Sequence, residues 1–441
     1  MIDLEAIAGI GNGLVTPEIY TDPELYQLEL RNVFGRSWLF LAHDSQIPTP
    51  GSFVQTYMGE DPVLVVRQRD GSVKAFLNQC RHRGMRICRA DAGTARTFTC
   101  SYHGWAYDLG GNLINVPAEQ AVYHGEIDKA RWSTQRVPRI AEVNGFYFGC
   151  WSEETPEFND YLGDMAWFFE SVTGRYDDGL ELIPGASKWV IDCNWKFASE
   201  QFASDMYHVP ISHASANVAL SENASERQMP PYDAPGRQFT ENGHGTGGPW
   251  APALVIPGMD KIHGPVWEEW LAENQEEVYR RIGRERALKT NGHSTIFPNF
   301  SWLSVTNTMR VWHPRGPGQM EVWAWSYVPK SAPDKVKEAV RLGVQYSFSP
   351  AGIFETDDGE NWTEIQQVLR GWKARSGHFN VQMGLGHEER EAAGVPGLTN
   401  QSTAETAARG FYQRWSDLIR GLSWEQIAEL DSQRGQEVQP A

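Results

Sequence analysis

Residues 80–84 read Cys-Arg-His-Arg-Gly, and residues 100–104 read Cys-Ser-Tyr-His-Gly. Each stretch holds one cysteine and one histidine with one or two residues between them, and each ends in a glycine, which permits a tight turn. Turn residues at Arg69-Asp70-Gly71 and at Gly110-Gly111 each separate two apolar runs. This pattern of short apolar runs separated by turn residues extends over residues 52–152. It predicts a small all-β module that carries the two Cys/His pairs at hairpin tips.

Four ligands on two facing loops, Cys80, His82, Cys100 and His103, suit two kinds of metal centre. One is tetrahedral zinc. The other is a Rieske [2Fe–2S] cluster, in which two cysteines hold one iron and two histidines hold the other. Zinc fingers usually pair like ligands on one loop, whereas each loop here mixes the two types. The pattern therefore favours the Rieske cluster, whose irons each draw one ligand from both loops.

The composition excludes several functions. The chain has 441 residues, a length typical of two to three domains, and a net charge of −17. This acidic balance argues against a nucleic-acid partner. We find no apolar run of 18 residues and no signal peptide in the opening MIDLEAIAGIGNG, so we expect no membrane span. The five cysteines are few and odd in number, so we do not expect them to form a disulfide framework. Such a chain suits a reducing compartment, which predicts a cytoplasmic location.

The chain beyond the β module predicts a second, mixed domain. We expect an N-terminal helical segment at 1–37 that packs on this domain, the β module at 38–155, and an α+β catalytic domain at 156–441. Residues 21–38 are typical of a helix, capped by Thr21 or Asp22. Three segments have the pattern of long strands, at 188–196, 294–305 and 319–329, and two have the pattern of helices, at 331–348 and 355–376. The stretch 222–265 predicts a lid, a binding loop or disorder.

A second ligand group lies in NWKFASEQFASDMYHVPISH, residues 194–213. Two histidines and one carboxylate on one face of Fe(II) make an open site for oxygen chemistry. A helix over residues 196–208 would place His208 at its end, with His213 folding back from the next turn. Asp205 would share its helical face with His208. From the residues alone, Asp205, Asp357 and Asp358 all qualify as the carboxylate ligand.

CRHRG at 80–84, CSYHGWAYD at 100–108 and the 194–213 segment resemble the large (α) subunits of aromatic-ring-hydroxylating dioxygenases. The resemblance implies an α+β fold: an all-β Rieske domain, then an antiparallel sheet covered by helices, of the helix-grip (START-like) kind. It assigns the third iron ligand to Asp358, and leaves Asp357 to helix capping or solvation. It also implies that Asp205 joins His208 to the Rieske ligand His103 of the next subunit in a trimer.

The same resemblance implies cis-dihydroxylation of an aromatic ring with both atoms of O₂. The cofactors would be the [2Fe–2S] cluster and a mononuclear Fe(II), and NADH would act indirectly through a flavin reductase and a Rieske-type ferredoxin. A small β subunit would complete an α₃β₃ hexamer. WHPRGP at 312–317 and RGWKARS at 370–376 resemble the toluene/biphenyl branch, whereas the four residues between His208 and His213 resemble the naphthalene branch.

Eight positions are expected to line the substrate pocket on the same resemblance: Gln201, Phe202, Met206, Val209, His293, Leu303, Phe348 and Phe354. None is Arg or Lys, so we expect a neutral substrate such as biphenyl, a polycyclic arene or dibenzofuran. Alternatives are a pure electron carrier, a zinc-binding structural protein, and an angular dioxygenase or monooxygenase. Four arginines around the first Rieske loop are candidates for a ferredoxin dock: Arg81, Arg83, Arg86 and Arg89.

Overall fold

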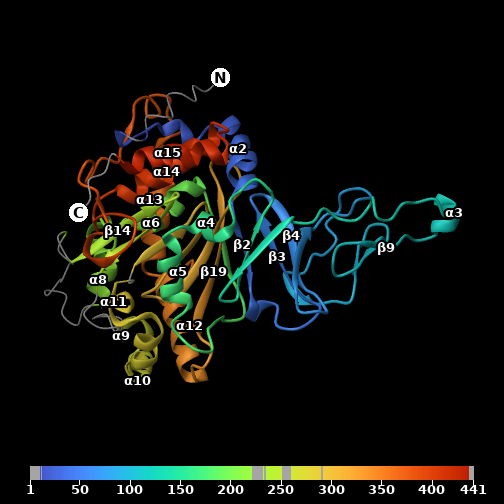
Figure 1. Ribbon diagram of the computed structural model, residues 1–441, viewed down its shortest axis with the longest axis horizontal. Coiled ribbons are helices and arrows are strands. Elements are labelled where there is room, and N and C mark those ends of the chain that lie inside the picture. The colour runs from blue at the N-terminus through green and yellow to red at the C-terminus, as the bar shows by residue number, and fades with distance from the viewer. Residues whose placement is uncertain are drawn as a thin grey trace. The chain divides into compact units, whose positions relative to one another are not determined.

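The computed structural model describes residues 10, 12–220, 232, 235–250, 260–289 and 292–436. Its contacts divide the chain into two compact units. Phe34–Thr155 form what we call the small unit, and Met1–Val33 together with Pro156–Ala441 form the large unit. In Figure 1 the strands of the small unit run from blue to cyan, and those of the large unit are mostly yellow to orange.

The small unit is built from antiparallel sheets with the strand orders β5-β4-β3-β6, β10-β11-β2 and β7-β8-β9. Their strands are β2 Leu39–His43, β3 Ser52–Met58, β4 Asp61–Arg67, β5 Val73–Leu77, β6 Ala92–Thr94, β7 Phe98–Thr99, β8 Ala106–Tyr107, β9 Leu113–Asn115, β10 Arg139–Val143 and β11 Phe146–Cys150. The hairpins expected at Arg69-Asp70-Gly71 and Gly110-Gly111 are confirmed as β4–β5 and β8–β9. A short α-helix, α3 (Glu119–Tyr123), lies between β9 and β10, and 3-10 turns lie at Phe34–Arg36 and Asp44–Gln46.

The large unit is organised around an antiparallel sheet with the order β12-β19-β18-β17-β16-β15-β14-β22-β21, in which β13 also pairs with β19. Its strands are β12 Leu180–Leu182, β13 Ser187–Ile191, β14 Gly236–Glu241, β15 His244–Pro249, β16 His293–Ile296, β17 Phe300–Leu303, β18 Thr308–Pro314, β19 Met320–Pro329, β21 Glu389–Arg390 and β22 Leu398–Gln401. β18 is buried along its whole length. A short pair, β1 (Leu14–Val15) and β20 (Phe379–Asn380), lies apart from this sheet.

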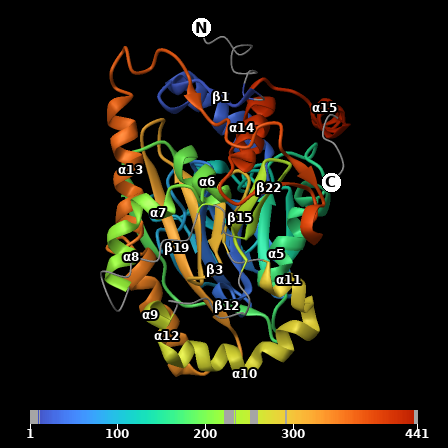
Figure 2. The same ribbon diagram turned by 90° about the vertical axis from the view of Figure 1, so that its left-hand side faces the viewer.

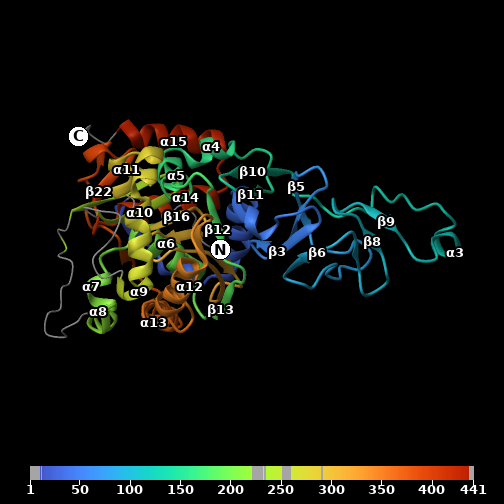
Figure 3. The ribbon, with the colours of Figure 1, turned by 90° about the horizontal axis from the view of Figure 1, so that it is seen from below.

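Helices cover this sheet, which confirms the expected α+β class. They are α2 Pro23–Leu28, α4 Phe158–Leu162, α5 Met165–Thr173, α6 Trp195–Ser204, α7 Val209–Ser212, α8 Ala214–Leu220, α9 Asp260–His263, α10 Pro265–Ile282, α11 Arg284–Leu288, α12 Asp334–Phe348, α13 Glu355–Val368, α14 Thr406–Ile419 and α15 Trp424–Gln436. α6 packs on the central strands β15 to β18, and α14 packs on α6 (Figure 2). α9, α10 and α12 form a cluster that Figure 3 shows from below. Among the described residues, no helix is long and apolar enough to cross a membrane.

Several boundaries differ from those that the sequence predicts. The strand expected over 188–196 ends at Ile191, because the side chain of Asn194 accepts a hydrogen bond from the Lys196 backbone N–H and starts α6. The segment 294–305 is not one strand but the hairpin β16–β17. The helix expected over 21–38 is capped by Asp22 but remains α-helical only to Leu28, and a π-helical turn follows.

The stretch 222–265 is not wholly irregular. It contains the hairpin β14–β15, whose two connecting residues are Asn242 and Gly243. Both have positive φ angles, +53° and +84°. Asn-Gly is the preferred dipeptide for a two-residue hairpin turn of this kind, so the signal was present in the sequence. Much of the remaining stretch lies outside the described residues.

A buried charge network holds the N-terminal segment to α6. The carboxylate of Glu29 is 1% exposed and pairs with the ammonium of Lys196, which is fully buried. The indole N–H groups of Trp195 and Trp415 donate to the same carboxylate at 2.9 and 2.8 Å. Three partners thus satisfy one buried anion, which joins the π-helical turn after α2 to α6 and α14.

We expect Glu29→Gln to destabilise the large unit by about 3–5 kcal/mol, because removing one partner of a buried pair leaves an uncompensated charge. Chemical denaturation followed by tryptophan fluorescence measures this. The control is Glu338→Gln, since Glu338 forms an exposed pair with Arg341, and such pairs contribute at most about 1 kcal/mol. Equal unfolding midpoints for the two variants would show that the buried network is not a major stabiliser.

Candidate metal centres

Two loops of the small unit, 80–85 and 100–105, have the same backbone hydrogen bonds. In each, the N–H of the cysteine donates to the carbonyl five residues later, at 2.8 Å. The N–H of the glycine four residues after the cysteine donates back to the cysteine carbonyl, at 2.9 and 3.0 Å. Gly84 and Gly104 have φ angles of +77° and +73°, which favour glycine. Two equivalent loops therefore present one cysteine and one histidine each.

The four side chains on these loops sort by type. Cys80 and Cys100 are both 2% exposed, in one hydrophobic cluster. Burial raises the pKa of the Cys80 thiol, and the neighbouring Cys100 adds to this. The imidazole rings of His82 and His103 lie 4.5 Å apart between centroids. Cysteine beside cysteine and histidine beside histidine is the arrangement that a Rieske cluster requires.

Two details fit a bound cluster. The Nδ1 atom of His82 is buried and has no hydrogen-bond partner among the described residues, as expected of an atom reserved for a metal. The hydroxyl of Tyr107 donates to the Cys80 sulfur at 3.4 Å, a contact that would stabilise a thiolate. The donor set of the small unit therefore fits a [2Fe–2S] cluster.

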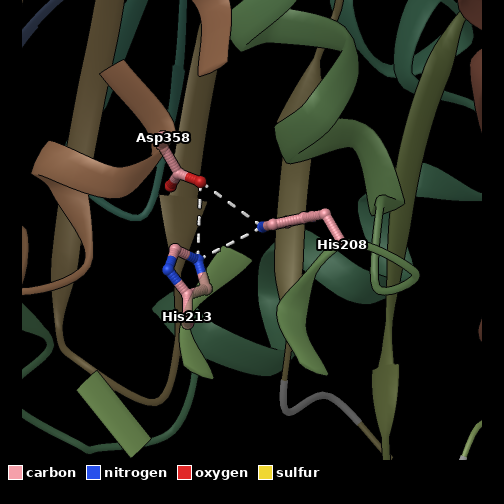
Figure 4. Close-up of side chains that lie close together, drawn as sticks. All are labelled: His208, His213 and Asp358. Atoms are coloured by element: carbon pink, nitrogen blue, oxygen red, sulfur yellow. Dashed lines mark hydrogen bonds and ion pairs between the residues drawn. The ribbon is translucent and has the colours of Figure 1, made fainter. Parts of the chain in front are cut away.

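His208, His213 and Asp358 form a second group in the large unit, in which the three ligand atoms lie within 4.8 Å of one another. The two Nε2 atoms are 3.2 Å apart, and each lies 3.4 Å from Oδ1 of Asp358. Figure 4 shows both rings and the carboxylate pointing toward one another. Two imidazoles and one carboxylate on one side of a common point are the ligand set of a facial triad, which leaves positions for other molecules.

The backbone between Asp205 and His208 differs from the helix that the sequence predicts. α6 ends at Ser204, four residues before His208, so Asp205 and His208 do not share a helical face. Instead, Oδ1 of Asp205 accepts from the backbone N–H groups of Tyr207 and His208 at 2.9 and 3.2 Å. This Asx-type turn folds the chain back before α7 begins at Val209.

Each histidine also faces a second carboxylate. Nδ1 of His208 lies 3.2 Å from Oδ2 of Asp205, and Nδ1 of His213 lies 3.2 Å from Oδ2 of Asp357. Carboxylates in this position fix the ring orientation of a metal-binding histidine. Asp357 was expected only to cap a helix or to face solvent. Instead, its carboxylate contacts the ring of His213.

The buried charges of the triad influence one another strongly. Burial lowers the pKa of His208, but the nearby carboxylates of Asp205 and Asp358 outweigh this and raise it to about 10. Burial raises the pKa of Asp358, which is 1% exposed, but His208 and His213 together lower it below its ordinary value. A buried carboxylate that stays ionised beside two imidazoles is well suited to a divalent cation.

Gln201 connects the triad to the helix α13. Its amide N–H donates to Oδ1 of Asp358 at 2.8 Å and lies 3.4 Å from Nε2 of His208. The indole N–H of Trp362 donates to the Gln201 carbonyl at 2.7 Å, which fixes which end of the amide faces the triad. No local pattern in the sequence predicts this contact of Trp362 with Gln201.

Most of the expected pocket residues surround the triad. The Phe202 ring stacks on His293 at 4.9 Å, and His293 lies 6.2 Å from the His208 ring. Phe348 stacks on Phe354 at 5.3 Å, and Phe354 meets His213 edge-on at 5.1 Å.

The other expected pocket residues are placed less directly. Leu303 is buried on β17, in register with His293. Met206 and Val209 are half-buried beside His208 in the chain.

One cation lies among these rings, although none of the expected pocket residues is charged. Arg310 on β18 is fully buried, with its guanidinium carbon 4.8 Å from the Phe202 ring and 5.4 Å from the Phe348 ring. It pairs at 2.5 Å with Glu355, which is 3% exposed. Burial raises the pKa of Glu355 to about 7, against the opposing effect of Arg310. A buried partner thus offsets the charge of this arginine.

We expect the two neighbouring aspartates to differ sharply in metal binding. Asp358→Ala should abolish stoichiometric Fe(II) binding by the large unit, whereas Asp357→Asn should weaken it about 10- to 100-fold, the range for residues that orient a ligand. Chelator competition measures both affinities, and Glu364→Gln, at an exposed position of α13, is the control. Equal effects at Asp357 and Asp358 would refute the assignment of Asp358 as the ligand.

Comparison with known proteins agrees with this geometry. Residues 37–131 match the Rieske [2Fe-2S] domain, and residues 169–421 match the catalytic domain of the ring hydroxylating alpha subunit. The chain is 45% identical to biphenyl 2,3-dioxygenase subunit alpha of Rhodococcus jostii (strain RHA1), over 98% of this chain and 94% of that protein. It is 46% identical to benzene 1,2-dioxygenase subunit alpha of Pseudomonas putida, over 96% and 95%.

Solved structures give the same result. Naphthalene 1,2-dioxygenase with indole bound in its active site superposes with a TM-score of 0.87 at 36% identity, and the match covers 95% of each chain. The Rieske domain and the iron domain of this family bring a [2Fe–2S] cluster and a mononuclear iron, and the Cys/His loops and the triad described above fit both. The chain therefore belongs to the family of aromatic-ring-hydroxylating dioxygenase α subunits.

Proposed function

We propose that this chain adds both atoms of O₂ to adjacent carbons of a neutral aromatic hydrocarbon or biaryl and so forms a cis-dihydrodiol. The observation that carries the proposal is the convergence of His208, His213 and Asp358 in a chain that also holds the two Cys/His loops. A pure electron carrier would not require the triad. A zinc-binding structural protein would require neither an open iron site nor the aromatic side chains around it.

His208, His213 and Asp358 would hold Fe(II), and Cys80, His82, Cys100 and His103 would hold the [2Fe–2S] cluster. When bound, these groups supply oxygen activation and single-electron transfer. The protein supplies orientation. Asp205 and Asp357 hold the two imidazoles with Nε2 toward the centre. Gln201, fixed by Trp362, places an N–H donor beside Asp358.

The substrate class follows from the surroundings of the triad. Phe202, Phe348 and Phe354 contribute aromatic rings rather than charge, and the buried Arg310 is already paired with Glu355. Among the described residues beside the triad, a carboxylated arene would therefore meet no free cation, and burying its charge would be costly. The relatives named above act on biphenyl and benzene, and chlorobenzene dioxygenase subunit alpha of Cupriavidus is 46% identical. We therefore favour a one-ring or biaryl hydrocarbon; a polycyclic arene, or dibenzofuran attacked at its angular position, is the alternative.

The partners are inferred from the relatives, which are named as alpha subunits or as the large component of an oxygenase system. We propose a small β subunit, an α₃β₃ hexamer, and NADH electrons delivered through a flavin reductase and a ferredoxin. In a head-to-tail trimer, Asp205 would link His208 to His103 of the next subunit. The five cysteines are unbonded to one another, which suits a reducing cytoplasm.

The ferredoxin would dock at the first Rieske loop. Arg81, Arg83 and Arg89 are exposed and could pair with an acidic partner. Arg86 is half-buried and donates to the Tyr57 hydroxyl at 3.0 Å, so we exclude it from the dock.

We expect His208→Ala to keep the Rieske visible spectrum and its reduction by dithionite, and to lose diol formation by at least about 100-fold, because one iron ligand is missing. Product analysis by mass spectrometry with biphenyl and benzene measures this. His378→Ala, an exposed histidine of the same unit, should behave as the unaltered chain. Diol formation by His208→Ala at an ordinary rate would disprove the triad.

Charge reversal at the dock should act on electron delivery alone. We expect Arg81→Glu with Arg83→Glu to slow reduction of the cluster by ferredoxin about 10-fold or more at low salt, and to reduce its salt dependence. Stopped-flow absorption follows this step. Arg69→Glu is the matched control, because Arg69 lies in the turn at the opposite end of β5. If the double variant and Arg69→Glu are reduced equally fast, the dock lies elsewhere.

A further inference from the structure

Arg310 occupies an unusual position for a charged residue. It lies in the middle of β18, its side chain is fully buried, and its guanidinium carbon lies within 5.4 Å of three ring centroids. The rings belong to Phe202 on α6, Trp312 on β18 and Phe348 at the end of α12. At these distances a cation attracts the face of each ring. One side chain therefore contacts three elements of the aromatic surroundings.

Two of these rings lead directly to the iron ligands. Phe202 stacks on His293, which lies near His208. Phe348 stacks on Phe354, which meets His213 edge-on. Movement of Phe202 away from Arg310 would therefore change the surroundings of His208, and movement of Phe348 would change those of His213.

Arg310 also fixes the start of the helix that carries Asp358. Glu355 is the first residue of α13 and pairs with Arg310 at 2.5 Å. Asp358 follows three residues later, on the same side of the helix. The ion pair thus joins the central strand β18 to the turn of α13 that supplies the carboxylate ligand.

The energetics argue against a role in stability alone. Two buried charges lose their hydration, and replacing such a pair by apolar residues is often neutral or stabilising. The pair is also incompletely satisfied, since Arg310 Nε and Glu355 Oε1 have no hydrogen-bond partner among the described residues. A well-packed apolar pair would serve the core at least as well, so the benefit of the charges lies in their geometry.

We propose that Arg310 is a positioning residue, which sets the spacing of the Phe202 and Phe348 rings and, through Glu355, the placement of Asp358. It thereby determines which edge of an aromatic substrate faces the iron. This inference rests on the proposed ring dihydroxylation. It concerns Arg310 and Glu355, neither of which is among the expected iron ligands. It makes Arg310 and Glu355 determinants of regiochemistry and of iron affinity.

The test is the double variant Arg310→Met with Glu355→Met in the full chain, assembled with its partners. It removes both charges together and leaves no unpaired one. We expect the thermal midpoint to stay within a few degrees of the unaltered chain. The ratio of biphenyl dihydrodiol regioisomers should change at least fivefold, hydrogen peroxide released per NADH should rise, and Fe(II) affinity in chelator competition should fall about 10-fold. Arg341→Gln with Glu338→Gln, an exposed pair on α12, should leave all of these unchanged.

An unchanged regioisomer ratio in the double variant, with the thermal midpoint also unchanged, would overturn the inference. Should the double variant not fold, Arg310→Lys replaces it. Lysine keeps a charge opposite Glu355 but lacks the planar guanidinium, so the ratio should still shift, and an unshifted ratio would equally refute the role. If the unaltered chain forms no dihydrodiol, the proposed function fails instead, and the Fe(II) affinities of the same variants still decide the effect of Arg310 on Asp358.

Discussion

The large unit depends on one buried carboxylate. Asp358 is 1% exposed and lies between two imidazoles, with its Oδ1 atom 3.4 Å from each Nε2. A buried charge persists only where it is paired and hydrogen-bonded. The chain meets this condition with His208, His213 and the amide of Gln201. A divalent cation held at the same point would complete the arrangement, and the surrounding side chains serve to keep these groups in place.

Side chains farther from that point hold these groups in position. Asp205 and Asp357 orient the rings from behind, and Trp362 orients Gln201. Farther out, the buried pairs Glu29–Lys196 and Arg310–Glu355 fix the helices α6 and α13, from which Gln201 and Asp358 project. α6 and α13 are far apart in the chain, so their alignment cannot come from local propensity. It comes from buried charges, whose misplacement is costly, and from the aromatic rings packed between them.

Much of this could be predicted from the sequence. The Cys/His loops follow from ligand spacing and glycine placement. The α+β class follows from the change, after residue 152, from short strand patterns to alternating strand and helix patterns. The end of α6 could not be predicted, because Asp205 forms a turn within a segment whose residue spacing predicts a continuous helix. The hairpin at Asn242-Gly243 could have been found from its dipeptide. The partners of Arg310 and Trp362 could not, because contacts between residues distant in sequence leave no local pattern.

The most direct test of the central claim is the origin of the oxygen atoms in the product. The fully assembled protein, supplied with NADH, reductase, ferredoxin and biphenyl under ¹⁸O₂, should give a cis-dihydrodiol in which both hydroxyl oxygens carry the label. Incorporation of a single labelled atom, or of oxygen from water, would contradict dioxygenation at the His208, His213 and Asp358 site.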